Sequence, residues 1–103
     1  MKIHKVVWLE QFVEKIEGKH GVGTREAEEV LWGDPHIRRA RKGHVKGQDV
    51  YAAYGKTGSG RLVLVAFVYK GQGSALPISA RDMTAAERRY YDEQNEAIRP
   101  YPK

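Results

Sequence analysis

Two arginines and one helix start are the features of this chain best suited to chemistry. Arg81 follows an apolar segment, and Thr84 and Glu87 come next at the spacing of a capping box, which predicts that a helix begins there. Arg61 opens a long apolar run directly after a glycine-rich turn. A guanidinium is a planar, permanently charged fork that matches phosphate oxygens, and the free N–H groups at a helix start also favour an anion. The pattern therefore indicates a phosphate-binding site.

Further residues add proton transfer and RNA contacts to this hypothesis. His20 lies beside Lys19 in a corner flanked by glycines, and histidine exchanges protons near neutral pH. It is equally typical of a surface histidine at a helix end. Arg88 and Tyr91 lie three residues apart on one helix face, where tyrosine either stacks on an unpaired base or packs against a sheet. Each of these features also fits a purely structural role.

Composition limits the class of protein. At 103 residues, 41% hydrophobic and 30% charged, the chain fits one soluble domain, which we place at residues 1–99 with a tail at 100–103. No apolar run approaches the ~20 residues of a membrane helix. The absence of cysteine excludes disulfides and thiolate metal sites and fits a reducing cytoplasm. The four histidines have no metal-ligand spacing, so we expect no metal and no cofactor.

The net charge of +5 is spread unevenly. Residues 1–35 carry five Lys/Arg against seven Asp/Glu, whereas residues 36–103 carry thirteen against six. Such asymmetry indicates either a polyanionic partner, nucleic acid or an acidic protein, or a solvated basic face that keeps the protein soluble.

The elements that position these residues follow from hydrophobic periodicity and turn signals. Leu9, Phe12, Val13 and Ile16 lie on one face of a first helix, and Thr24 is expected to cap a second helix over 25–32. A last helix is predicted at 84–97. Strands are predicted at 2–7, 36–42, 48–55, 61–69 and 74–80, with a turn bounded by Gly43 and Gly47. The fold class is thus α+β, with two N-terminal helices, an antiparallel sheet of about four strands and a C-terminal helix.

Two strands carry specific expectations. The run over 61–69 is almost unbroken in apolar residues, which predicts a central strand covered on both faces. Pro77 cannot donate to a ladder, so strand 74–80 should have an open side or a bulge there. If these strands are antiparallel neighbours, Arg61 and Arg81 lie at the same edge of the sheet, and their guanidinium groups are expected to converge near the last helix.

The ordered set of motifs resembles the BrnT family of ribonuclease toxins from bacterial type II toxin–antitoxin modules. The resemblance runs from Val6 to about Asp92. Its markers are Trp8, Lys19-His20-Gly21-Val22, Glu26-Ala27 with Val30-Leu31, Asp34-Pro35, Tyr51-x-x-Tyr54-Gly55-x-Thr57-x-x-Gly60-Arg61-Leu62, Val65-x-Phe67, Ile78-Ser79-Ala80-Arg81-Asp82-Met83-Thr84 and Glu87-Arg88-Arg89-x-Tyr91.

The resemblance implies a RelE-like fold and a metal-independent endoribonuclease that cleaves RNA and inhibits translation. It also implies an antitoxin, usually of ribbon-helix-helix type, through which alone the toxin contacts operator DNA. Carried over by position, the catalytic residues are His20, Arg61, Arg81 and Glu87, with Glu87 as the alternative proton acceptor to His20. The RNA-binding residues are Lys19, Arg88 and Tyr91.

The sequence is also compatible with two other functions. Leu9, Phe12 and Ile16 stand where family members usually carry Asp, Lys and Asn. The alternative is therefore a non-catalytic module of this family that binds an antitoxin or RNA. A structural domain without a nucleic-acid role also fits the composition, but it leaves the arrangement of Arg61 and Arg81 unexplained.

Overall fold

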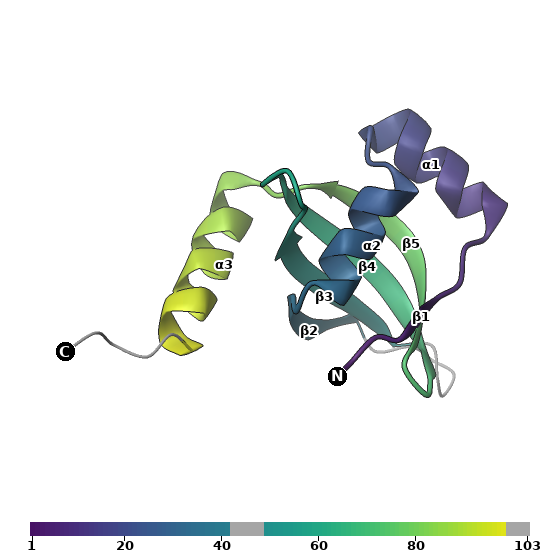
Figure 1. The fold of residues 1–103 in the computed structure, drawn as a ribbon. Helices are drawn as coiled ribbons and strands as arrows, with labels where there is room; N and C mark the ends of the chain where they lie inside the picture. Colours follow the sequence, from purple (N-terminus) through teal and green to yellow (C-terminus); the bar gives the residue numbers. More distant parts are fainter. Residues whose placement is uncertain (42–48, 99–103) are drawn as a thin grey trace.

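The computed structural model describes residues 1–41 and 49–98, which form three helices and one five-stranded sheet (Figure 1). The helices are α1 (Glu10–His20), α2 (Thr24–Trp32) and α3 (Ala85–Ile98). The strands are β1 (Lys5–Val6), β2 (His36–Arg41), β3 (Val50–Lys56), β4 (Leu62–Gly71) and β5 (Ser74–Asp82). The expected turn at Gly43 and Gly47 and the expected tail at 100–103 lie outside the described residues.

The sheet runs in the order β1-β5-β4-β3-β2. Strands β2 to β5 form the expected antiparallel meander, in which each strand pairs with the next one in sequence. The short β1 adds a parallel pair, Lys5 opposite Ser74 and Val6 opposite Ala75. The α+β class is confirmed. The sheet is mixed because β1, which precedes the first helix, pairs parallel with β5.

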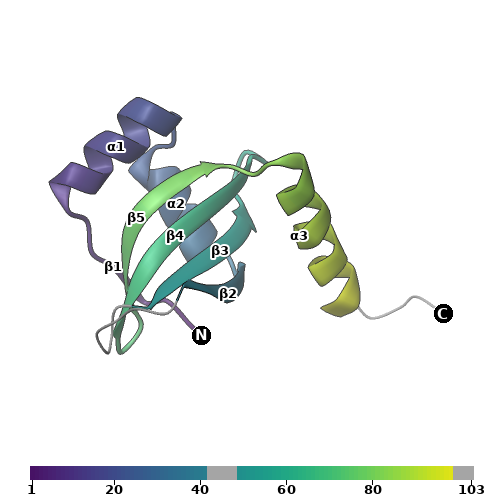
Figure 2. The same cartoon turned by 180° about the vertical axis from the view of Figure 1, so that it is seen from behind.

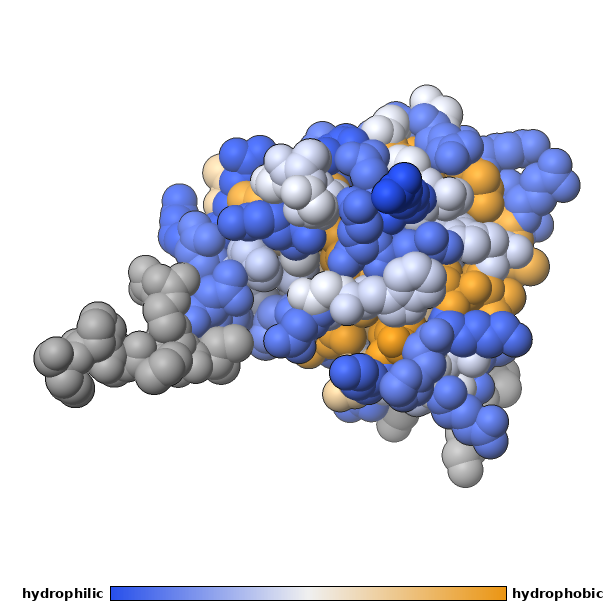
Figure 3. Space-filling model, in the orientation of Figure 1, coloured by the Kyte–Doolittle hydropathy of each residue, from blue (hydrophilic) through white to orange (hydrophobic). Residues whose placement is uncertain are grey.

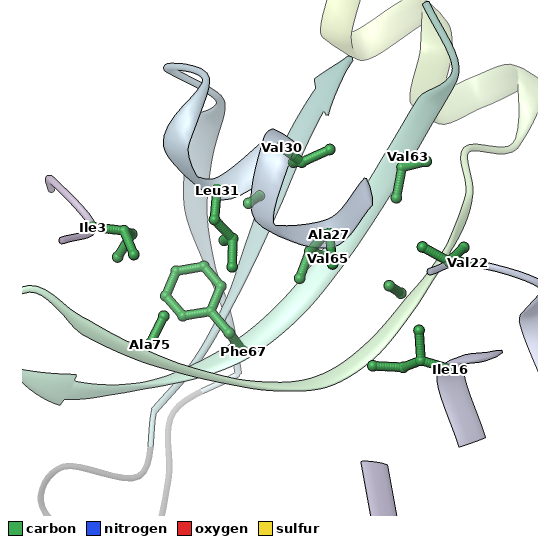
Figure 4. Packing of buried hydrophobic residues seen from close by; sticks show 12 residues of the cluster. Ile3, Ile16, Val22, Ala27, Val30, Leu31, Val63, Val65, Phe67 and Ala75 are labelled. Atoms are coloured by element: carbon green, nitrogen blue, oxygen red, sulfur yellow. The ribbon is translucent and has the colours of Figure 1, made fainter. Parts of the chain in front are cut away.

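The hydrophobic core lies between one face of the sheet and helices α1 and α2 (Figure 4). Strand β4 supplies Val63, Val65 and Phe67, which have no exposed surface, and α1 and α2 supply Ile16 and Val30. The outer surface of these helices is largely hydrophilic (Figure 3). None of the described helices is long and apolar enough to cross a bilayer.

The opposite face of the sheet, here called the open face, carries the alternate residues of β4. Leu64, Ala66 and Val68 point to this face and are only half-buried. Helix α3 leaves the end of β5 and extends beside the sheet rather than across it (Figure 2). The expectation that strand 61–69 is covered on both faces is therefore wrong for the open face.

Two local predictions have clear outcomes. The register of β4 and β5 shifts between Ala66 and Phe67, whose partners are Ser79 and Pro77, so the bulge predicted at Pro77 is confirmed. The expected cap at Thr24 is wrong by one residue. Gly23 is the N-cap of α2, and its N–H donates to Oε1 of Glu26 at 3.0 Å. A side-chain carboxylate three residues on thus satisfies the backbone in place of a threonine hydroxyl.

Candidate functional site

Arg81 and Glu87 form a two-pronged ion pair at the end of β5. Nη1 of Arg81 lies 2.7 Å from Oε1 of Glu87, and Nη2 lies 2.8 Å from Oε2. This parallel geometry is the strongest that a guanidinium and a carboxylate adopt. Hydrogen bonds from Arg81 are the main cause that lowers the pKa of Glu87 to about 2. The carboxylate is therefore fully ionised at neutral pH and holds its proton too weakly to be an effective general base.

The capping box at the start of α3 is confirmed. The N–H of Thr84 donates to Oε1 of Glu87 at 2.8 Å, and the N–H of Glu87 donates to Oγ1 of Thr84 at 3.2 Å. Glu87 thus fixes the first turn of α3 and the Arg81 fork at the same time. Both of its oxygen atoms are engaged, which favours a positioning role over proton transfer.

Arg61 is the centre of a second cluster of charges. Its Nε and Nη2 donate to the two carboxylate oxygens of Asp82 at 2.7 and 3.2 Å. Its Nη1 donates to both oxygens of Glu26 at 3.1 and 3.2 Å and to the carbonyl of Gly21 at 3.0 Å. Contact with Asp82, followed by Glu26, raises the pKa of Arg61 further, and Arg61 in turn lowers the pKa of Asp82. Arg61 therefore ties α2, β5 and the corner after α1 together.

The two arginines share one rim of the sheet but leave it on opposite faces. Asp82, the partner of Arg61, pairs across the sheet with the core residue Val63. Arg81 pairs with Leu64, which points to the open face. The antiparallel pairing of β4 and β5 confirms the shared rim. Both arginines contact Asp82 from opposite faces of the sheet, Arg61 at the carboxylate and Arg81 at the main-chain carbonyl.

His20 and Lys19 lie next to Arg61 rather than Arg81. They end α1, and Gly21 turns the chain with φ 64°, a conformation that favours glycine. The N–H of Val22 donates to the carbonyl of Ile16 at 3.2 Å and closes this corner. His20 is half-buried and Lys19 is exposed. The bond from Arg61 to the Gly21 carbonyl thus fixes the backbone directly after His20.

Arg88 and Tyr91 lie on α3 beside the rim. Arg88 is exposed and close enough to Asp82 to contribute to the lowered pKa of that carboxylate, after the larger effect of Arg61. Tyr91 is half-buried and packs against the second apolar cluster, which contains Tyr54 and Met83. Of the two roles that the sequence left open for Tyr91, packing against the sheet is thus present.

A cluster that the sequence did not single out lies on the open face, where β2 and β3 meet α3. Nε2 of His36 lies 2.8 Å from the hydroxyl of Tyr90, and the Tyr54 and Tyr90 ring centroids are 5.0 Å apart. The guanidinium carbon of Arg38 lies 4.8 Å from the centre of the Tyr90 ring. His36 and Arg38 alternate along a strand, which is the one sequence signal that places them on the same face.

Metal ligation has no obvious place in the part of the chain described. Within residues 1–41 and 49–98, no three His, Asp or Glu side chains gather into a group able to hold a metal ion. The charged groups at the rim are instead matched to one another as arginine–carboxylate pairs.

The fold and rim define a small basic α+β domain with arginines arranged at one sheet edge. Residues 8–87 match the family described as the ribonuclease toxin, BrnT, of type II toxin–antitoxin systems. The chain belongs to this family, as its motifs predicted, and so it is a ribonuclease toxin whose partner is an antitoxin.

A solved structure supports the fold. The 1.1 Å crystal structure of the Brucella abortus ribonuclease toxin BrnT is similar to this chain with a TM-score of 0.56 and 20% sequence identity. The similarity covers 78% of this chain and 96% of that one. A search of curated proteins found no match.

Proposed function

We propose that this protein is a metal-independent endoribonuclease that acts in the cytoplasm and inhibits translation by cutting RNA. The observation that supports it most is the rim, where Arg61 contacts the corner that carries His20 and where Arg81 lies on the opposite face of the same sheet edge. A proton-transfer group beside fixed cations is what cleavage of a phosphodiester requires.

The proposed reaction is attack of a ribose 2′-OH on the adjacent phosphate. The 2′-oxygen–phosphorus bond forms while the bond from phosphorus to the 5′-oxygen breaks. His20 accepts the proton of the 2′-OH and returns it to the 5′-oxygen, which leaves a 2′,3′-cyclic phosphate and a 5′-hydroxyl. Arg61 and Arg81 stabilise the charge that develops on the phosphate. Glu87 holds the Arg81 fork in place.

Arg81 retains hydrogen-bonding capacity for this task. A guanidinium carries five N–H groups. Those directed at Glu87 and at the Asp82 carbonyl come from Nη1 and Nη2. The remaining N–H groups, on Nε and Nη2, are the proposed donors to a phosphate at the rim. Lys19, Arg88 and Tyr91 surround the rim and are the proposed RNA contacts.

The proposed partner is an antitoxin of ribbon-helix-helix type that neutralises the toxin. Contact with operator DNA is proposed to occur only through that antitoxin. The excess of basic residues in 36–103 supports both an RNA substrate and an acidic partner segment.

Cleavage of RNA by purified protein in EDTA tests the proposal. The wild type should cut single-stranded RNA and leave cyclic phosphate ends. His20→Ala should lower the rate by at least about 10²-fold, whereas His4→Ala, at an exposed histidine far from the rim, should not. RNA binding without cleavage by the wild type would instead identify a non-catalytic module. Loss of activity in EDTA that returns with a divalent metal would overturn the metal-free reaction.

A further inference from the structure

A single cross-strand row on the open face joins the rim to the cluster at β2. Arg81 of β5 pairs with Leu64 of β4, Leu64 pairs with Tyr54 of β3, and Tyr54 pairs with His36 of β2. At about 4.8 Å between neighbouring strands, the row spans roughly 14 Å. Arg81 at one end of the row and His36 at the other would therefore contact different parts of an extended ligand.

Helix α3 contacts both ends of this row. Glu87 binds Arg81 at one end, and Tyr90, one helical turn further on, binds His36 at the other. Seen from the open face, α3 lies along one side of the sheet and leaves β4 and β5 uncovered (Figure 2).

The His36 cluster, defined as His36, Arg38, Tyr54 and Tyr90, combines a cation with stacked rings. The His36 and Tyr90 ring centroids are 5.3 Å apart in an edge-on arrangement. Arg38 lies over the Tyr90 ring, which restrains the guanidinium before any ligand arrives. Burial, and then the charge of Arg38, lower the pKa of His36, so the imidazole is neutral at pH 7.

Arg38 differs from Arg39, Arg61 and Arg81 in its electrostatic environment. Arg61 and Arg81 are paired with carboxylates, and Arg39 pairs with Asp49 at 3.2 Å. Among the residues that the structure describes, no carboxylate forms an ion pair with Arg38, and its side chain is exposed. Its charge is therefore not neutralised within the described protein and is available to an external anion.

We propose that Arg38, held by Tyr90 and His36, is a binding subsite for one nucleotide of single-stranded RNA, away from the linkage that is cut. The N–H edge of Arg38 contacts the phosphate, and its outer plane accepts a stacked base. This proposal rests on the proposed function, since it extends the RNA path from the rim across the open face. The subsite binds and positions the RNA, and the cleavage reaction takes place at the rim.

Fluorescence anisotropy with a labelled single-stranded RNA tests the subsite. Methylation of the 2′-oxygens removes the attacking hydroxyl, so the wild-type protein can be used without cleavage. Arg38→Ala should raise the Kd by about 10-fold or more and lower the slope of log Kd against log salt by about 1. Arg38→Lys keeps the charge without the planar fork and should recover part of the affinity. Tyr90→Leu removes the ring and should weaken binding in the same direction.

The matched control is Arg39→Ala. Arg39 is the next residue of β2, has the same charge and points to the opposite face of the sheet. Its removal should change the Kd by less than about twofold, because Arg39 lies on the opposite face of the sheet from the proposed RNA path and already pairs with Asp49. In cleavage assays Arg38→Ala should raise KM and leave kcat largely unchanged.

The outcomes separate this proposal from the proposed function. If the wild type cuts RNA but Arg38→Ala behaves like Arg39→Ala, the subsite is wrong and the nuclease stands. If Arg38→Ala weakens binding of the antitoxin and leaves RNA binding intact, the surface belongs to the protein partner and the subsite is wrong. If the wild type neither binds nor cuts RNA, both proposals fail.

Discussion

Arg61 and Arg81 emerge from one rim of the sheet on opposite faces, each held by its own carboxylates. Arg61 faces the helices and pairs with Glu26 and Asp82, and Arg81 faces α3 and pairs with Glu87. The rim therefore carries two separately paired arginines, and Asp82 contacts both of them. A nucleotide linkage that contacts both has to cross the edge of the sheet, and the roles of the two arginines can be tested separately.

Arg81→Ala should impair catalysis more than stability. The Thr84 cap still satisfies Glu87 in this variant, so the start of α3 is preserved. Loss of one phosphate-stabilising group should lower the cleavage rate on the order of 10²-fold and relieve growth arrest on induced expression. The control, Arg25→Ala, removes a charge whose side chain is 91% exposed on α2 and should cleave like the wild type. Equal rates in both variants would exclude Arg81 from the site.

Glu87→Gln should lower stability in a pH-dependent manner. The pKa of Glu87 is about 2 in the folded protein, below the ordinary value of about 4.3, so folding favours the ionised form. Its contribution to the free energy of unfolding is present above pH 4.3 and is lost as the pH falls towards 2. We expect the variant to lose about 1–2 kcal/mol at pH 7, after allowance for the part-exposed Arg81. Urea unfolding at pH 7 and at pH 2.5 measures the difference, which should be clearly smaller at the lower pH, where the pKa of Glu87 is approached but not yet passed.

The same variant decides between the two proton acceptors. Glutamine keeps the shape of the side chain but cannot accept the proton of a 2′-OH. If Glu87 only positions Arg81, Glu87→Gln should cut RNA within about 10-fold of the wild-type rate, whereas loss of a general base costs about 10²–10⁴-fold. A loss in that larger range, with His20→Ala still active, would reverse the proposed assignment.

Arg61→Ala should lower stability because it leaves two carboxylates without their cation. The Arg61 side chain is 28% exposed, between the surface and buried cases, so we expect a loss of about 1–3 kcal/mol in the free energy of unfolding. The main-chain carbonyl of Gly21 also loses a hydrogen bond. Because Gly21 directly follows His20, the cleavage rate should fall as well. Chemical denaturation measures the effect, with Arg25→Ala as the control. The free energy of unfolding of the control should lie within about 0.5 kcal/mol of the wild-type value. An unchanged unfolding midpoint for Arg61→Ala would show that the ion pairs of Arg61 do not stabilise the fold.

Two glycines offer a paired test of the packing between α2 and β3. A Cβ built at Gly55 lies 2.9 Å from Cγ1 of Val30, a stiff and buried side chain. Gly55→Ala should therefore destabilise the protein by about 1–3 kcal/mol. A Cβ at Gly18, in α1, meets nothing within 4 Å, and Gly18→Ala should stabilise by about 0.5–1 kcal/mol through helix propensity. Thermal melts of both variants check the opposite signs.

The local signals in the sequence predicted the parts of the site that depend on near neighbours. Thr84 and Glu87 cap α3, Pro77 lies beside a bulge, and antiparallel pairing brings Arg61 and Arg81 to one rim. Each of these follows from residues close in sequence or from the alternation of strands. The family match over residues 8–87 confirms the class of toxin that the motifs indicated.

The features of the fold and site that the sequence did not predict depend on contacts between distant segments. His36 and Tyr90 are 54 residues apart, and only the path of α3 beside the open face brings them together. The carboxylates that bind Arg61 and Arg81 come from α2, β5 and α3, and no local pattern predicts these pairings. The parallel pairing of β1 with β5 likewise has no signal in the first six residues. The assignments of His20, Arg61, Arg81, Glu87, Lys19, Arg88 and Tyr91 to catalysis and RNA contact stay predictions for the experiments above.

Helix α3 contacts the body of the protein along its first turns, through the Arg81 fork, the Tyr90–His36 hydrogen bond and the packing of Tyr90 and Tyr91 against the cluster of Tyr54 and Met83. Such an element opens locally at a lower free energy than the sheet. Amide protons of α3 should therefore exchange with solvent sooner than those of β4, and they should slow when RNA or the antitoxin binds.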